Sequence, residues 1–146
     1  MLSRSGYGEQ ARFALRALRM RPDLFDIFII NIPWGTTGHL AGDTEELNYI
    51  KDTIGRTMMY AQQGGQFDMS LQVTVPNEFE KIAAVNIGYT AGIETTKVAP
   101  QWIEKSNAFV DKIIVVSNHA KKVFENTKYN VNDEAGNQYP NWGLTV

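Results

Sequence analysis

His39 and Glu94 are the two side chains of this sequence whose type and setting suit acid–base chemistry. His39 lies in the polar, glycine-punctuated stretch GTTGHLAG, and histidine titrates near neutral pH. Glu94 follows shortly after an apolar run that predicts a strand. Each residue also has a plainer interpretation. His39 would then be a surface residue, and Glu94 a solvated acid near the start of the next helix, where the helix dipole favours negative charge.

A glycine loop near the N-terminus has the residue types of an anion-binding turn. Gly6-Tyr7-Gly8 begins the pattern G-x-G-x-x-A, which leads into an amphipathic segment. The free amide groups at such a helix start bind phosphates and other anions. Three interpretations are open: a dinucleotide-binding loop, a general anion-binding loop, and a glycine turn that only starts the helix.

The dinucleotide interpretation is the weakest of the three because its context is missing. That fold needs a strand directly before the first glycine and an acid at the end of the second strand. Only the short, polar MLSRS precedes Gly6, and Asp26 begins the next apolar run instead of ending it. An NAD-dependent oxidoreductase is therefore kept as a minor alternative.

Other residues suit binding. Trp34 ends an apolar run, so its ring could stack on a sugar or pack at the rim of the fold. His119, in the first turn of a predicted helix, would meet a phosphate or point to solvent. Arg12, Arg16 and Arg19 recur on one helical face. That stripe suits a negatively charged partner, although it is more typical of a solvated helix face.

Composition bounds the class of protein. The 146 residues, 43% of them hydrophobic and 21% charged, predict a single domain spanning residues 1–146. A net charge of −2 does not indicate nucleic-acid binding, and the longest apolar stretch is too short for a membrane span. The chain has no cysteine and only two histidines, so no metal site is predicted. The missing cysteines and the lack of a secretory signal favour the cytoplasm.

Apolar periodicity predicts an α/β fold, with a Rossmann-like, open, mainly parallel sheet flanked by helices. The predicted helices cover residues 8–19, a segment capped by Asp43 that runs to Ala61, residues 100–110, and residues 118–127 capped by Ser117. The predicted strands are 26–32, 71–75, 81–89 and 112–117, of the type buried on both faces. Because no strand precedes the glycine loop, the first strand of such a sheet is expected to be missing.

Two stretches are ambiguous. Only residues 76–80 (PNEFE) separate two predicted strands, whereas a parallel crossover usually needs a dozen residues or more. Three explanations of this short connection are possible: a tight turn, a shifted register or a locally antiparallel pair. The polar residues 128–146 predict an irregular or partly extended tail.

Four stretches, in this order, resemble the N-terminal half of GT-B glycosyltransferases of the group 1 type. They are the SGYG loop before the first helix, IGYTAGIE after a strand, PQW at a helix start, and the run D-x-I-x-V-x-S followed by K-V-F. The last run corresponds to Asp111, Ile113, Val115 and Ser117, then Lys121 or Lys122, and Phe124. Together the stretches cover about residues 4–129.

The resemblance implies the acceptor-side part of an enzyme that transfers a sugar from a nucleotide-sugar donor to an unknown acceptor. It implies no cofactor, because the nucleotide sugar is a substrate, and it implies a second domain that holds most of the donor site. The chain is therefore expected to be catalytically incomplete alone. Ligands of open α/β sheets bind beyond the carboxyl ends of the strands. The expected site combines catalytic Glu94 and His39 with substrate-binding Gly6, Tyr7, Gly8, Trp34, Thr90, Gly92, Ser117 and His119.

A non-catalytic function is the main alternative. A sheet that lacks a strand offers an open edge, and open edges pair with other chains. The chain would then be an α/β binding module that associates with a second copy of itself through that edge.

Overall fold

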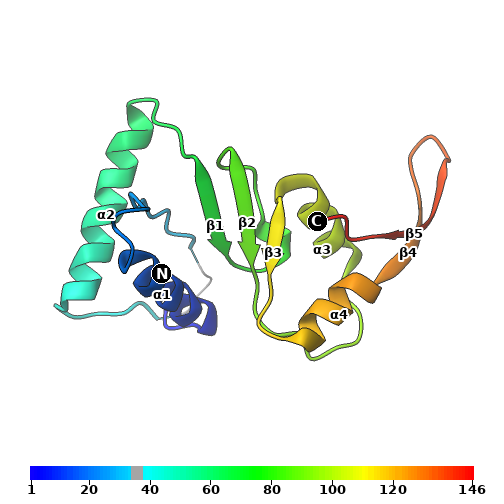
Figure 1. The fold of residues 1–146 in the computed structure, drawn as a ribbon, viewed down its shortest axis with the longest axis horizontal. Coiled ribbons are helices and arrows are strands. Elements are labelled where there is room, and N and C mark those ends of the chain that lie inside the picture. The colour runs from blue at the N-terminus through cyan, green and yellow to red at the C-terminus, as the bar shows by residue number, and fades with distance from the viewer. Residues whose placement is uncertain (34–37) are drawn as a thin grey trace. The chain divides into compact units, whose positions relative to one another are not determined.

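The computed structural model describes residues 1–33 and 38–146 (Figure 1). The chain divides into two compact units, residues 1–66 and residues 67–146, and each is described by itself. The first unit contains the helices α1 (Gly6–Arg19) and α2 (Glu45–Gln62). The second contains a parallel sheet, two helices and a hairpin. Within the described residues, no helix is long and apolar enough to cross a membrane.

The two helices of the first unit begin at hydroxyl caps. Ser5 Oγ accepts a hydrogen bond from the Gly8 amide at 3.1 Å, so α1 starts two residues earlier than predicted. Thr44 Oγ1 accepts from the Leu47 amide, so Thr44 and not Asp43 is the N-cap of α2. The carboxylate of Asp43 instead accepts from the Asn48 side chain at 2.6 Å.

The predicted strand 26–32 is wrong, because this segment pairs with no strand among the described residues. Two of its backbone groups bind side chains of α2. The Ile29 amide donates to Thr57 Oγ1 at 2.9 Å, and the Arg56 guanidinium donates to the Ile27 carbonyl. Ile29 is buried with Leu15 of α1 and Ile50 of α2, so the apolar run supplies the core of this unit from an unpaired chain.

The sheet of the second unit is parallel, and it confirms the predicted α/β class. Its strands are β1 (Met69–Val73), β2 (Val85–Tyr89) and β3 (Lys112–Ile114), in the order β1-β2-β3 (Figure 1). The ambiguous joint is a parallel connection over residues 74–84, which contains the 3-10 helix η1 (Pro76–Glu78). The sheet is open, with β1 and β3 as its edge strands.

Strand β2 begins later than predicted because residues 80–83 bind side chains instead of a strand. The Gln72 side chain accepts from the Glu80 amide at 2.9 Å and donates to the Glu80 carbonyl at 2.7 Å. Asn86 Oδ1 accepts from the amides of Ile82 and Ala83, both at 3.0 Å. These bonds hold residues 80–83 against the sheet, and the connection between the two parallel strands spans residues 74–84.

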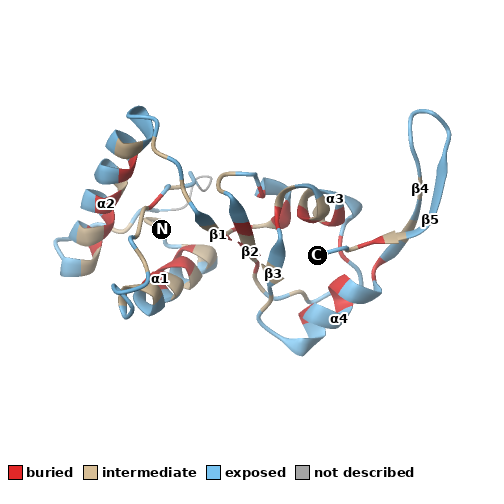
Figure 2. Cartoon of the chain, turned by 45° about the horizontal axis from the view of Figure 1, so that its top comes forward, coloured by how far each residue is buried: buried red, intermediate tan, exposed pale blue. Residues whose placement is uncertain are grey.

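One face of the sheet is covered by α3 (Pro100–Phe109) and α4 (Asn118–Asn126). Ile113 and Val115 pack there against Ile103 and the other buried residues of the cluster, which are Val98, Val123 and Phe124. The opposite face carries the exposed apolar residues Met69, Val85, Ile114 and Val116. Figure 2 shows exposed stretches in the strands of this sheet. The prediction that the strands are buried on both faces is therefore wrong for these positions.

Residues 128–146 contain an antiparallel hairpin where the sequence predicted an irregular or partly extended end. Strands β4 (Lys128–Asn132) and β5 (Gln138–Gly143) pair with a shift in register. The Asp133 carboxylate closes the turn by accepting from the amide and the side chain of Asn137, which lowers the pKa of Asp133. Trp142 and Leu144 anchor this end on the helical cluster.

Candidate functional site

The parallel register aligns the carboxyl ends of the three strands. Val73 pairs with Tyr89, and Tyr89 pairs with Ile114, so the next residues along the chain emerge at one edge of the sheet. Thr74 and Thr90 are the first residues beyond β1 and β2, and each is 1% exposed. We call the residues that follow the strands here, 74–78, 90–95 and 115–119, the carboxyl edge.

The carboxyl edge brings together five residues predicted for the site: Thr90, Gly92, Glu94, Ser117 and His119. The Thr90 amide donates to the Ile114 carbonyl at 3.2 Å. Ser117 Oγ caps α4 by accepting from the Ala120 amide at 3.0 Å. His119 Nε2 lies 3.3 Å from the Thr95 carbonyl oxygen, which joins the loop after β2 to the first turn of α4.

The side chains of this cluster differ in how firmly they are held. Thr90 is buried, whereas Glu94 and His119 are exposed. A methyl group on Gly92 would meet Val116 at an ordinary 3.6 Å, so packing does not demand a glycine there. Glu94 makes no hydrogen bond or ion pair to another described residue, so its carboxylate stays available to a ligand.

Glu78 is a carboxylate of the carboxyl edge that sequence reasoning missed. Thr74 Oγ1 donates a hydrogen bond to Glu78 Oε2, and the Glu78 amide donates to the Val75 carbonyl at 3.0 Å. The sequence signal was the acid in PNEFE directly after a strand ending in proline, which the ambiguity of that joint obscured.

The glycine loop belongs to the first unit, and its second glycine has a packing role. A methyl group on Gly8 would stand 2.3 Å from the Ser3 carbonyl oxygen, so only glycine admits the N-terminal segment this close to α1. Gly6 has no atom within 4 Å of the same position, and Tyr7 is half-buried. The interpretation as a turn that starts a helix therefore accounts for Gly8.

His39 also belongs to the first unit, in a short contact with the N-terminus. The Arg4 amide donates to the Gly38 carbonyl at 2.9 Å, and the Leu40 amide donates to the Leu2 carbonyl at 2.8 Å. The His39 side chain between these bonds is exposed. Trp34, the remaining predicted residue, lies outside the described residues.

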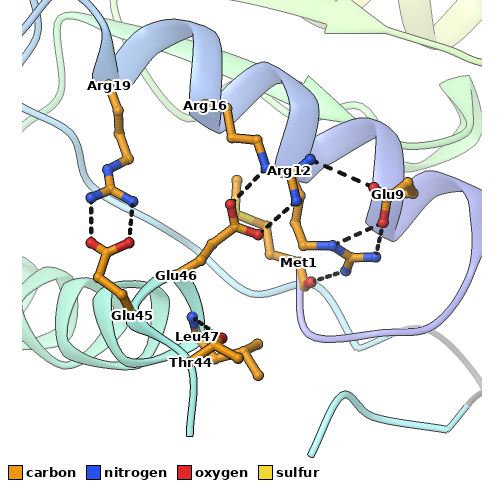
Figure 3. A network of polar contacts seen from close by, with 9 residues as sticks. All are labelled: Met1, Glu9, Arg12, Arg16, Arg19, Thr44, Glu45, Glu46 and Leu47. Carbon is orange, nitrogen blue, oxygen red and sulfur yellow. Dashed lines mark hydrogen bonds and ion pairs between the residues drawn. The ribbon is translucent and has the colours of Figure 1, made fainter. Parts of the chain in front are cut away.

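The arginines of the α1 stripe are paired within the first unit, so the stripe is not a free binding surface (Figure 3). Arg16 and Arg19 bind Glu46 and Glu45 of α2, each with a shortest distance of 2.6 Å. The hydrogen bond from Arg16 lowers the pKa of Glu46 and raises that of Arg16. Arg12 is buried, and it donates to the carbonyls of Met1 and Ser3 at 2.6 and 3.0 Å.

A cavity of about 210 Å³ in the first unit is lined by Arg19, Tyr49 and Arg56, among others. It is smaller than typical ligand pockets of about 300–1,000 Å³. Both of its arginines are already paired, Arg19 with Glu45 and Arg56 with Asp26. Asp26, which also lines the cavity, is bound to Arg56 at 2.9 Å.

In the part of the chain that the structure describes, no three His, Asp or Glu side chains gather closely enough to hold a metal ion. No family model, no curated protein and no solved structure matches the chain. A function for this chain is therefore inferred from its sequence and its local geometry.

Proposed function

We propose that this chain is the acceptor-side part of a glycosyltransferase that uses a nucleotide-sugar donor, and that the carboxyl edge is its ligand-binding surface. The observation that carries the proposal is the contact between His119 and the Thr95 carbonyl. It joins the two loops whose sequences, IGYTAGIE and the stretch after VVS, resemble the glycosyltransferase family. Open α/β sheets bind ligands at this edge.

The chemistry that the site would perform is proton removal and charge stabilisation. Glu94, exposed and without a bonding partner among the described residues, would accept the proton of an acceptor hydroxyl while that oxygen bonds to the anomeric carbon of the donor. The bond from that carbon to the nucleoside diphosphate breaks, and the diphosphate leaves with the electron pair. His119 and Ser117 at the start of α4 would assist by facing the departing phosphate. A second domain would supply most of the donor site, as in the family resembled.

Titration calorimetry with a panel of compounds tests the proposal. The panel contains maltose, methyl α-D-glucopyranoside, UDP-glucose, GDP-mannose and NAD. We expect weak carbohydrate binding and no response to millimolar NAD. Glu94→Gln should weaken carbohydrate binding, whereas Glu104→Gln on the exposed surface of α3 should not. A chain that binds no carbohydrate, or binds NAD in preference, contradicts the proposal.

Self-association through the sheet is a second candidate, favoured by its open edges and its exposed apolar face. Ile114 of the edge strand β3 is 44% exposed, and Val116 beyond it is 50% exposed. Edge strands with exposed apolar side chains pair with other strands. In this candidate, a second copy of the chain occupies the edge.

A further inference from the structure

The carboxyl edge contains two acids, and they differ in how they are supported. Glu94 sits in the loop after β2 with no hydrogen bond to another described residue. Glu78 ends the 3-10 helix η1, and its carboxylate accepts from the Thr74 hydroxyl. Only Glu78 therefore holds its carboxylate in a fixed orientation before any ligand arrives.

The backbone that carries Glu78 is anchored on both sides. Pro76, at the start of η1, is buried, and Phe79, directly after Glu78, is 0% exposed. A methyl group on Gly88 of β2 would lie 2.3 Å from the Phe79 ring, so the ring packs directly on the strand. Because the residue after Glu78 is locked onto β2, the exposed Glu78 side chain projects from a rigid support.

Thr74 orients the carboxylate from the protein side. Its side chain belongs to a residue that is 1% exposed, so its hydroxyl is shielded from solvent, and it donates to one oxygen of Glu78. An ionised carboxylate has about four acceptor positions on its two oxygens. The Thr74 hydroxyl occupies one of them, which leaves the others to face solvent because the residue is exposed.

We propose that Glu78 accepts hydrogen bonds from ligand hydroxyl groups at the carboxyl edge, with Thr74 as its positioning residue. This assignment rests on the proposed function. The ligand class that would bind beside Glu78 is a neutral, polyhydroxylated compound, as expected of a sugar acceptor. Hydroxyl donors form short, strong bonds with a carboxylate, whereas a phosphate would be repelled. Glu78 thus belongs to the acceptor and not to the donor diphosphate.

Calorimetric titration of maltose into the wild-type chain and four variants tests this assignment. We expect Glu78→Gln to weaken maltose binding about tenfold, because hydrogen bonds to a charged group are lost. Thr74→Val should weaken it less, and Thr74→Ser, which keeps the hydroxyl, should restore it. Glu80→Gln removes an exposed carboxylate two residues away and should leave binding unchanged.

The thermal unfolding midpoint separates this effect from a structural one. Because the Glu78 side chain is exposed, Glu78→Gln should keep the wild-type midpoint while losing affinity. Equal maltose affinity in Glu78→Gln and the wild type overturns the assignment of Glu78 and leaves the proposed function standing. Equal weakening by Glu80→Gln overturns it too, because the effect would then be one of net charge. If the wild type binds no carbohydrate of the panel, both proposals fail.

Discussion

At the scale of single residues, the glycine loop shows how one pattern serves different purposes. Gly6-Tyr7-Gly8 has the types of an anion-binding turn, yet Gly8 is explained by the close approach of the Ser3 carbonyl. The amide of Gly8 donates to Ser5 Oγ, so the cap already satisfies one of the helix-start donors. Sequence alone cannot separate these roles, because both need a residue without a side chain.

Alanine should destabilise the chain at Gly8 but not at Gly6 if packing is the reason for Gly8. Gly8→Ala forces a methyl group against a backbone oxygen, and we expect it to lower the free energy of unfolding by about 1–3 kcal/mol. Gly6→Ala has open space around it and should stay within about 0.5 kcal/mol of the wild type. Urea denaturation followed by circular dichroism measures both. Equal stability of the two variants would argue against the packing role.

At the scale of elements, helices were easier to predict than strands. The start and cap of α4 follow from Ser117 and an amphipathic period, and both are confirmed. The cap of α2 was misplaced by one residue because Asp43 and Thr44 are both good caps, and the choice depends on backbone geometry. The segment 26–32 has strand composition, but a strand needs a partner, which no local pattern supplies.

Ion pairs between α1 and α2 make the stability of the first unit depend on pH. Arg16 and Arg19 lie in the last turn of α1, and Glu45 and Glu46 lie in the first turn of α2. At these positions the helix dipole stabilises each of the four charges. The pKa of Glu46 is lowered from its ordinary 4.5 by the hydrogen bond from Arg16. Because the pKa of Glu46 is lower in the folded state than in the unfolded chain, its ionised form stabilises the fold. This stabilisation is fully present above the unfolded pKa, and it is lost as the pH falls through the folded pKa.

We therefore expect Glu46→Gln to reduce the thermal unfolding midpoint slightly at pH 7. The difference from the wild type should begin to shrink as the pH falls past 4.5, and it should vanish once the pH is below the lowered pKa of folded Glu46. The loss is small because the pair is partly exposed and screened by solvent. Differential scanning calorimetry between pH 3 and pH 7 at low salt measures it, with Glu104→Gln on the exposed surface of α3 as the control. A difference that persists at low pH would mean that Glu46 acts through packing rather than charge.

At the scale of the whole molecule, the sequence predicted the fold class and the proximity of two loops of the candidate site. Strand ends in a parallel sheet meet at one edge, so IGYTAGIE and the stretch after VVS were expected together, and His119 beside Thr95 confirms that proximity. Glu78 was missed because its position depends on where β2 begins, which the side chains of Gln72 and Asn86 decide. Such bonds between distant residues leave no mark on local periodicity.

The open edge of the sheet leads to a separate prediction about dimer formation. If a second copy pairs with the edge at β3, light scattering should show a dimer whose fraction rises with protein concentration. Ile114→Lys places a charge on that edge and should shift the equilibrium to the monomer, whereas Met58→Lys on the exposed side of α2 should not. A strictly monomeric wild type at every concentration would remove this candidate.

Carbohydrate binding at the carboxyl edge can be tested by locating the bound ligand. Two-dimensional amide spectra of the ¹⁵N-labelled chain, titrated with maltose, report binding residue by residue. Shifts are expected only at residues 77–78, 90–95 and 117–119, and they should be smaller in Glu78→Gln. Shifts confined to other segments, or an unchanged spectrum at saturating carbohydrate, would contradict it.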